Sequence, residues 1–317
     1  MLNHRRLCKY NERLIIPYAY RPFDNRWLYK ENRFLWRSVE WLYQQFQIKN
    51  IALVSTKILA GEYFHHSFVS DRVGDYCYLS NRTKEFSIFF PLYTYDLALR
   101  SLIDDEYPNQ KVFFDKIGIS FNPKAKKSNI QEKIFSLLFT SYDKKVAPEE
   151  IFYYIYAVLY SNIYRQKYKE FLKIDFPKIP FTKNYKLFKQ FSNFGKELAD
   201  LHLLKSPLLN KTSSRFEGEG DGLIKKLNYD EKKKRIFINK NQYFTNVNSE
   251  LWNYYIGGYQ VLRKWLKDRK GRVLSSEEIN HYIKVIKAIK ETIKLQKEID
   301  KLFPKIEKFI LELKFED

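Results

Sequence analysis

Short runs of alternating apolar and polar residues fill the first third of the chain. The runs are rich in β-branched and aromatic side chains and are separated by turn-forming residues such as Pro22, Asp24 and Gly74. This pattern is typical of short, half-buried β-strands. It predicts strands at residues 14–20, 27–29, 50–55, 68–69 and 86–95, with one helix at residues 37–46 between them.

Helical periodicity begins near residue 148. Ile151, Ile155 and Val158 recur at helical spacing behind a proline and two glutamates, which suit the first turn of a helix. The two prolines of the following DFPKIPF segment exclude a regular helix there. A second helix is expected to start with Thr182 as its N-cap, because apolar residues then recur on one side as far as Leu198.

From residue 205 onward, the chain predicts a loop, a hairpin and a helix. The polar, glycine-bearing run at residues 205–222 predicts a surface loop or a hinge. The pattern that follows predicts a hairpin of residues 223–229 and 235–239 around a turn at 230–234, and a strand at 252–256. Gly257 and Gly258 are expected to form a turn before a helix at residues 259–269, with Gly271 at its C′ position.

The C-terminal part predicts one long helix. Ser275 and Glu278 form a capping-box pattern, and isoleucines from Ile279 to Ile299 trace an apolar stripe. Pro304 is expected to end or kink this helix, with another short helical piece at residues 305–317. The fold class predicted is α+β, with a strand-rich N-terminal part. We divide the chain into three parts: a core at residues 1–204, a part with the hairpin, the strand and the basic helix at 205–274, and a helical segment at 275–317.

Composition adds a strong positive charge to this picture. The 317 residues are 44% apolar, enough to bury a core, and 57 Lys and Arg against 37 Asp and Glu give a net charge of +20. Both halves of the chain carry more basic than acidic residues. Such a field attracts polyanions such as nucleic acid. The alternative is a Lys-rich proteome, in which the charge has no partner.

The chain lacks the marks of a secreted or membrane protein. Cys8 and Cys77 are far apart and have no metal-like spacing, which fits a reducing cytoplasm. No apolar run approaches the roughly 20 residues that span a bilayer. The start of the sequence, MLNHRRLCKYNERL, lacks the apolar core of a signal peptide. We therefore expect a cytoplasmic protein with no membrane partner.

Arginines and lysines are the candidate site residues. The helix expected at residues 259–269 and its exit concentrate Arg263, Lys264, Lys267, Arg269, Lys270 and Arg272 against the single acidic residue Asp268. Phosphate contact is our preferred interpretation, and a solvated helix face is the alternative. Further DNA-contact candidates are Arg21, Arg26 and Arg72. For these three, an ion pair with the neighbouring Asp24 or Asp71 is an equally good interpretation.

Patterns for catalysis, cofactors and metals are weak. The glycine run FEGEGDG at residues 216–222 follows a polar segment where a cofactor loop needs a buried strand, and no NPPY motif is found. Adjacent His65 and His66 would point to opposite faces of a strand. Acidic runs such as residues 104–106, or Glu312 with Lys314, match generic surface patterns. We assign no catalytic, cofactor-binding or metal-binding residue.

Five segments resemble a known protein family when taken together in order. They are YRPFDNRWLY (residues 20–29), FVSDRVGDYCYLS (68–80), FFPLYTY (89–95), the run from IFYYIYAVLYSNIYRQKY to DFPKIPF (151–181) and NKNQYFTNVNSELWNYYIGGYQVLRKWLKDRKGRVLS (239–275). The chain from about residue 17 to 300 resembles the C-terminal specificity region of type ISP restriction-modification enzymes. These bacterial enzymes are N6-adenine-specific DNA methyltransferases.

The resemblance implies a DNA target-recognition module without chemistry of its own. In this family the methyltransferase domain, with its S-adenosylmethionine, lies N-terminal to the specificity region, so it would be a partner domain or subunit. The expected partner ligand is double-stranded DNA, with base-reading side chains sought at residues 57–64, 100–145 and 181–215. Two alternatives stay open. One is a self-contained metal-dependent nuclease, and the other is a protein-interaction module.

Overall fold

The N-terminal strands form a hairpin and a small sheet. The computed structural model describes residues 10–31, 33–35, 40–95 and 126–312. A short 3-10 turn, η1 (Glu12–Leu14), leads into β1 (Ile15–Arg21), which pairs antiparallel with β2 (Asp24–Tyr29). The strands expected at 14–20 and 27–29 are therefore confirmed. β2 starts earlier than expected because polar residues 24–26 also pair with β1 beside a bulge.

A three-stranded antiparallel sheet lies beside this hairpin. Its order is β4 (Ser67–Ser70), β3 (Ala52–Ser55) and β5 (Ile88–Pro91). The strand expected at residues 86–95 is broken at Leu92, whose N–H turns to the carbonyl of Ile51, and β6 (Tyr93–Thr94) then pairs with β7 (Lys127–Ser128). The helix α1 (Glu40–Gln45) lies within the span expected at 37–46.

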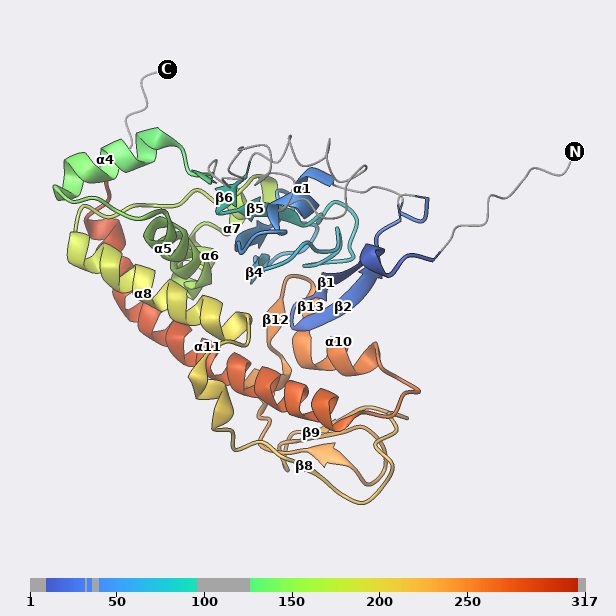
Figure 1. Ribbon diagram of the computed structural model, residues 1–317. Coiled ribbons are helices and arrows are strands. Elements are labelled where there is room, and N and C mark those ends of the chain that lie inside the picture. Colours follow the sequence, from blue (N-terminus) through green and yellow to red (C-terminus); the bar gives the residue numbers. More distant parts are fainter. Residues whose placement is uncertain (1–9, 32, 36–39, 96–125, 313–317) are drawn as a thin grey trace, which may run out of the picture.

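Helices of the middle third form the next layer (Figure 1). They are α4 (Glu132–Tyr142), α5 (Pro148–Tyr160), α6 (Asn162–Lys167), α7 (Lys169–Ile174) and α8 (Tyr185–His202). The helix expected after Pro148 is confirmed as α5. Thr182 as the N-cap of α8 is wrong. The side chain of Asn184 accepts the N–H of Leu187 and caps the helix, while Thr182 pairs with Ile310 in a short bridge.

A second sheet lies in the C-terminal third. After η2 (Pro207–Asn210), the order of strands is β8 (Phe216–Glu217), β11 (Tyr243–Phe244), β10 (Arg235–Phe237) and β9 (Asn228–Asp230). The expected hairpin is present as β9 and β10, which are shorter than predicted. The loop expected at residues 205–222 holds both η2 and β8.

The segment before the basic helix differs from the prediction. Trp252, expected to start a strand, instead ends the short helix α9 (Ser249–Trp252), in which the side chain of Asn248 accepts the N–H of Leu251 at 3.0 Å. A two-residue-per-strand hairpin, β12 (Tyr255–Ile256) and β13 (Tyr259–Gln260), then leads into α10 (Val261–Lys267). The prediction that Gly271 occupies the C′ position of α10 is wrong: Gly271 has a left-handed φ of 81°, but it lies beyond that position.

The long helix α11 (Ser276–Lys308) ends the described chain. Its capping box of Ser275 and Glu278 is present as predicted. Of the two alternatives for Pro304, an end of the helix is wrong, because α11 continues to Lys308, whereas a kink there stays a prediction. The separate helical piece is not found at residues 305–312, and residues 313–317 lie outside the described residues. Phe303 and Ile306, on either side of the proline, are fully buried and hold the last turns against the core.

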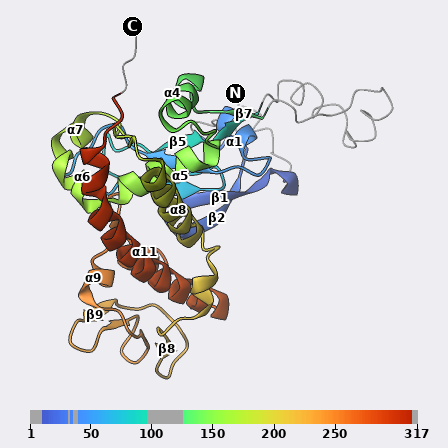
Figure 2. The same cartoon turned by 90° about the vertical axis from the view of Figure 1, so that its left-hand side faces the viewer.

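Two hydrophobic cores meet along α11. The first gathers residues from all three predicted segments, for example Phe68, Leu262 and Ile286. The second holds α5, α8 and the last turns of α11, with Tyr154, Phe188 and other large rings. Figures 1 and 2 show α11 running from the sheet of β8 and β9 to the helical layer. The division at residues 204 and 274 stays a prediction, although the first core crosses both boundaries. No helix among the described residues is long and apolar enough to cross a membrane.

The turn between β12 and β13 requires a glycine. Gly257 has φ 57°, its N–H donates to the carbonyl of His65 at 2.6 Å, and a Cβ there would lie 1.9 Å from the carbonyl oxygen of Leu79. The turn is therefore wedged between two segments of the N-terminal part. Gly271 has a similar φ, yet nothing lies within 4 Å of a Cβ placed on it.

We predict that Gly257→Ala lowers the free energy of unfolding by at least about 3 kcal/mol, because backbone strain adds to the clash with Leu79. Gly271→Ala is the matched control and should cost about 1–2 kcal/mol from the backbone alone. Urea unfolding of both variants checks this. Equal losses would contradict the wedged position of Gly257.

Candidate nucleic-acid interface

Helix α10 separates an apolar face from a positive one. Leu262, Trp265 and Leu266 are buried, whereas Arg263, Lys267 and Lys270 are exposed. The i, i+4, i+7 spacing of the three cations places them on one side of the helix and its exit. The apolar side is held by packing of Trp265 on Tyr282 of α11, with ring centroids 5.0 Å apart. This packing holds α10, and with it the row of cations, in a fixed position against α11.

The positive row borders a surface hollow of about 410 Å³. We call this the α10 basic hollow; its lining residues are Lys226, Leu227, Asn228, Tyr229, Trp252, Arg263, Lys267 and Lys270. Four of them are cationic and none is acidic. Among the described residues, none forms an ion pair with these four cations. The rings of Tyr229 and Trp252 stack at 5.1 Å in the wall, which gives the hollow an aromatic side.

Two other predicted cations of this segment are partly neutralised. Lys264 lies 2.6 Å from both carboxylate oxygens of Asp268 and keeps a quarter of its side chain exposed. Arg272 is exposed but approaches Glu278 at 3.4 Å. Both side chains can still reach solvent, so either could turn to a phosphate at the loss of a weak surface pair.

Arg269 points inward, unlike the other cations. Its guanidinium donates to both carboxylate oxygens of Asp24, at 2.9 and 3.2 Å, and to Glu278 at 3.1 Å. It also lies over the ring of Trp265 at 3.6 Å, and only 9% of the side chain is exposed. These bonds engage all three nitrogens of Arg269. We therefore treat it as a structural residue and leave it out of the proposed interface.

Asp24 is the centre of this buried network. Its side chain is 2% exposed, and Arg26 is its second partner at 2.9 Å. Burial by itself would raise the pKa of Asp24, but the hydrogen bonds and charges of Arg269 and Arg26 outweigh burial and lower that pKa below its ordinary value. The carboxylate thereby ties the β1–β2 turn to α10.

The remaining predicted arginines are also paired within the protein. Arg21 approaches Asp75 at 3.1 Å with 12% of its side chain exposed, and Arg72 bonds Asp71 at 2.9 Å. Lys205 is a second partner of Asp71 at 2.7 Å. The structure shows the expected internal pair for Arg26 with Asp24 and for Arg72 with Asp71, whereas the partner of Arg21 is Asp75 and not the expected Asp24. A DNA contact by Arg21, Arg26 or Arg72 stays a prediction.

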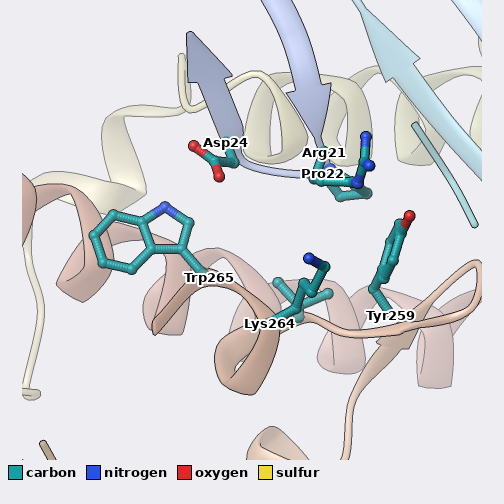
Figure 3. Close-up of a pocket in the computed structure, with 7 residues that line it drawn as sticks. Arg21, Pro22, Asp24, Tyr259, Lys264 and Trp265 are labelled. Carbon is teal, nitrogen blue, oxygen red and sulfur yellow. The ribbon is translucent and has the colours of Figure 1, made fainter. Parts of the chain in front are cut away.

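The seam between the β1–β2 turn and α10 leaves a very small cavity (Figure 3). Arg21, Pro22 and Asp24 face the side chains of the α10 region across it, among them Tyr259, Lys264 and Trp265. Its volume is about 10 Å³. This is room for about one water molecule, so the cavity cannot hold a cofactor or a substrate.

The glycine run at residues 216–222 belongs to the sheet of β8. A Cβ on Gly218 would lie 2.1 Å from the carbonyl oxygen of Asn241, and the N–H of Gly222 donates to the side chain of Gln242 at 2.8 Å. The backbone of the run packs closely against the segment at Asn241 and Gln242, and Gly218 leaves the space that this close contact requires.

The two adjacent histidines have different neighbours. His66 bonds Glu85 at 3.0 Å, whereas His65 lies beside Tyr255. Within the described residues, no group of three or more His, Cys, Asp or Glu could hold a metal ion. Residues 104–106 and Lys314 lie outside the described residues, and Glu312 is exposed at their edge.

Sequence reasoning missed two buried groups. Glu85 accepts hydrogen bonds from His66, Ser80 and the N–H groups of residues 60 and 61. Burial opposes the charge of Glu85, but these bonds lower its pKa to about 2. Arg165 is the second, with 8% of its surface exposed. No local pattern marks either residue: Glu85 takes most of its partners from residues 60–66, and Arg165 lies in a run of aromatic residues.

The fold and the α10 basic hollow define a mixed α and β domain that, among the described residues, presents a row of cations without acidic partners. The chain belongs to the family of type ISP C-terminal specificity domains, whose model matches residues 1–298. No protein of curated function matches the sequence.

Solved structures show the same fold at low sequence identity. One is a nuclease-deletion mutant of the type ISP restriction-modification enzyme LlaGI in complex with a DNA substrate mimic. Its sequence is 20% identical, its TM-score is 0.64, and the match covers 93% of this chain and 26% of that chain. The ATP-dependent type ISP restriction-modification enzyme LlaBIII bound to DNA is 21% identical, with a TM-score of 0.67. This match covers 92% of this chain and 19% of that chain. The protein of the DrdV–DNA complex is 19% identical, with a TM-score of 0.68, and the match covers 90% of this chain and 28% of that chain. The chain thus spans less than a third of each of these proteins.

The Asp24 network predicts a pH-dependent loss of stability. Because folding lowers the pKa of Asp24, the ionised carboxylate stabilises the fold above its unfolded pKa of about 3.9, and this contribution is lost as the pH falls through the folded pKa. Asp24→Asn should lower the free energy of unfolding at pH 7 by about 3 kcal/mol or more. The difference from the parent should shrink below about pH 4. Urea unfolding across this pH range measures it.

Asp71→Asn is the control for that variant. Asp71 also has two basic partners, but 21% of its side chain is exposed. Its loss should cost under about 1 kcal/mol. A loss for Asp24→Asn no larger than for Asp71→Asn would show that the buried network does not hold the turn.

Proposed function

We propose that this chain recognises target sites in double-stranded DNA for a type ISP restriction-modification enzyme. The observation that carries this function is the row of Arg263, Lys267 and Lys270 along the α10 basic hollow, free of acidic partners among the described residues. Membership of the specificity-domain family supports it. The DNA complexes of LlaGI, LlaBIII and DrdV, which share the fold, support it as well.

The proposed contact is mainly with phosphates. Cations at helical spacing on a helix present their charges along one line, which matches the phosphate backbone and fixes the position of the protein on the duplex. Lys226 adds a fourth charge from the neighbouring segment. The stacked Tyr229 and Trp252 give the hollow a flat, stiff wall. Base-edge readers stay predicted at residues 57–64, 100–145 and 181–215. Residues 100–125 of the second segment lie outside the described residues.

Chemistry would then belong to a partner. We assign the methyl transfer to adenine, with its S-adenosylmethionine, to a methyltransferase domain or subunit of the same system. That enzyme would flip the adenine while this domain holds the duplex. We place the protein in the cytoplasm, where its DNA substrate would be.

Replacing Arg263, Lys267 and Lys270 together by Gln should weaken duplex binding at low salt. The slope of log affinity against log salt should become less steep by about 2.7, because each lost phosphate contact removes about 0.9. Fluorescence anisotropy with a labelled duplex over a range of salt concentrations measures both quantities.

A charge-matched control is available away from α10. Lys178, in the α7–α8 connection, and Lys305 and Lys308, in the last turn of α11, are exposed and lie outside the segments in which base-edge readers are predicted. Replacing these three by Gln changes the net charge by the same amount and should leave the slope nearly unchanged. Equal effects of the two triple variants would refute the α10 basic hollow as the contact and would leave only the diffuse charge of the protein.

A further inference from the structure

Arg165 is a buried cation on the short helix α6. Only 8% of its surface is exposed. Its Nε donates to the carbonyl of Leu159 at 2.6 Å, and its guanidinium lies over the ring of Tyr160 at 4.7 Å. Both contacts fix the direction of the side chain, and neither supplies a negative charge.

Within the described residues, no carboxylate pairs with Arg165. The nearby acids serve other groups. Asp300 accepts from Ser161 and Asn162 at 2.8 and 2.9 Å, and Glu250 approaches Lys297 at 3.4 Å. Removing a charge from water without a counter-charge costs several kcal/mol. An anionic ligand would supply the missing charge.

The guanidinium lines an open pocket of about 380 Å³, which we call the Arg165 pocket. Its lining residues are His65, Asn162, Arg165, Glu250, Asn253, Tyr254, Tyr255, Ile293, Gln296 and Lys297. Burial and the positive charge of Arg165 lower the pKa of His65 to about 3, so this histidine is neutral at pH 7. His65 and Asn253 are thus neutral polar groups that can share an oxyanion with Arg165.

A lysine groove adjoins this pocket. Glu250, Ile293 and Lys297 line both the pocket and a neighbouring hollow of about 330 Å³. The basic residues of that hollow are Lys234, Lys290, Lys294 and Lys297, against one acidic residue, Glu250. Lys290, Lys294 and Lys297 follow helical spacing along α11. The approach to Arg165 is therefore positive over a longer path than the pocket itself.

We propose that the Arg165 pocket binds a phosphate group of the DNA backbone, as a second contact besides the α10 basic hollow. This inference rests on the proposed function. The two sites border the same segment, since Trp252 lines the hollow and the next residue, Asn253, lines the pocket. A planar guanidinium matches two phosphate oxygens at once. Arg165 also belongs to the segment at residues 151–181, on which the family resemblance rests, and a backbone contact there is independent of the target sequence.

The test compares the whole chain with two pocket variants. Arg165→Gln removes the cation. Asn253→Asp places a carboxylate on the wall of the same pocket and keeps the oxygen that accepts from Gln260 at 3.4 Å. It should therefore fold at least as stably as the parent, even if Arg165→Gln does not fold. Lys301→Gln, at an exposed residue of α11 that pairs with Glu298, is the charge control.

Two probes distinguish the source of the phosphate. Inorganic phosphate, exchanged for chloride at constant ionic strength, should raise the melting temperature of the parent and of Lys301→Gln by more than that of Asn253→Asp or Arg165→Gln, which keep only the α10 basic hollow. With a labelled duplex, both pocket variants should bind roughly tenfold or more weakly at low salt. The salt slope of Arg165→Gln should become less steep by about 0.9.

The outcomes separate this inference from the proposed function. Loss of the phosphate response with unchanged duplex binding would overturn the DNA assignment and leave a site for free phosphate. Pocket variants that match Lys301→Gln with both probes would overturn the pocket altogether. If the α10 triple variant keeps full duplex binding while the pocket variants lose it, the pocket stands and the α10 contact fails.

Discussion

The apolar stripe of α11 is the constraint on which the other features depend. This helix has 33 residues, and its buried side chains pass from the first core, with Tyr282 and Ile289, to the second core, with Phe303 and Ile306. Burial of such side chains contributes roughly 1.5–3 kcal/mol each and is non-directional. The stripe therefore holds the two cores in line along one rigid axis.

Both positive sites take their positions from this axis. Trp265 packs on Tyr282 and sets the side of α10 that faces solvent, while Ile293, Gln296 and Lys297 form one wall of the Arg165 pocket. The capping residue Glu278 also bonds Arg269, so the start of α11 joins the buried network around Asp24. A binding surface made of rigid elements presents its charges with little loss of conformational entropy on binding.

The net charge of +20 divides into cations that build the fold and cations available to a ligand. Arg269 and Arg21 pair with carboxylates from segments distant in sequence, and Arg26 pairs with Asp24 in its own strand. Arg263, Lys267 and Lys270 are exposed. Charge composition alone cannot make this distinction, because it depends on where Asp24 and Asp75 lie in the fold.

Local patterns predicted the elements that depend on local chemistry. The strands β1, β3 and β4, helix α5 and the capping box of α11 all follow from periodicity and capping. The errors lie where tertiary packing decides. Pro304 is tolerated because Phe303 and Ile306 are buried, and the α10 segment starts with a hairpin because the turn at Gly257 is wedged against Leu79.

The candidate site was predictable to the same extent. The row of Arg263, Lys267 and Lys270 follows from helical spacing and is exposed as that spacing suggests. The inward turn of Arg269 could not be predicted, since its partner Asp24 lies 245 residues away in sequence. Arg165 was missed because it lies in a motif of aromatic residues, and only the fold shows that no acid accompanies it within the described residues.

Selection of duplexes from a random DNA pool by this chain tests the central claim most directly. If the domain recognises a target, sequencing of the bound fraction will show one short motif enriched over successive rounds. Binding without any enrichment would contradict target recognition and reduce the protein to a non-specific polycation surface.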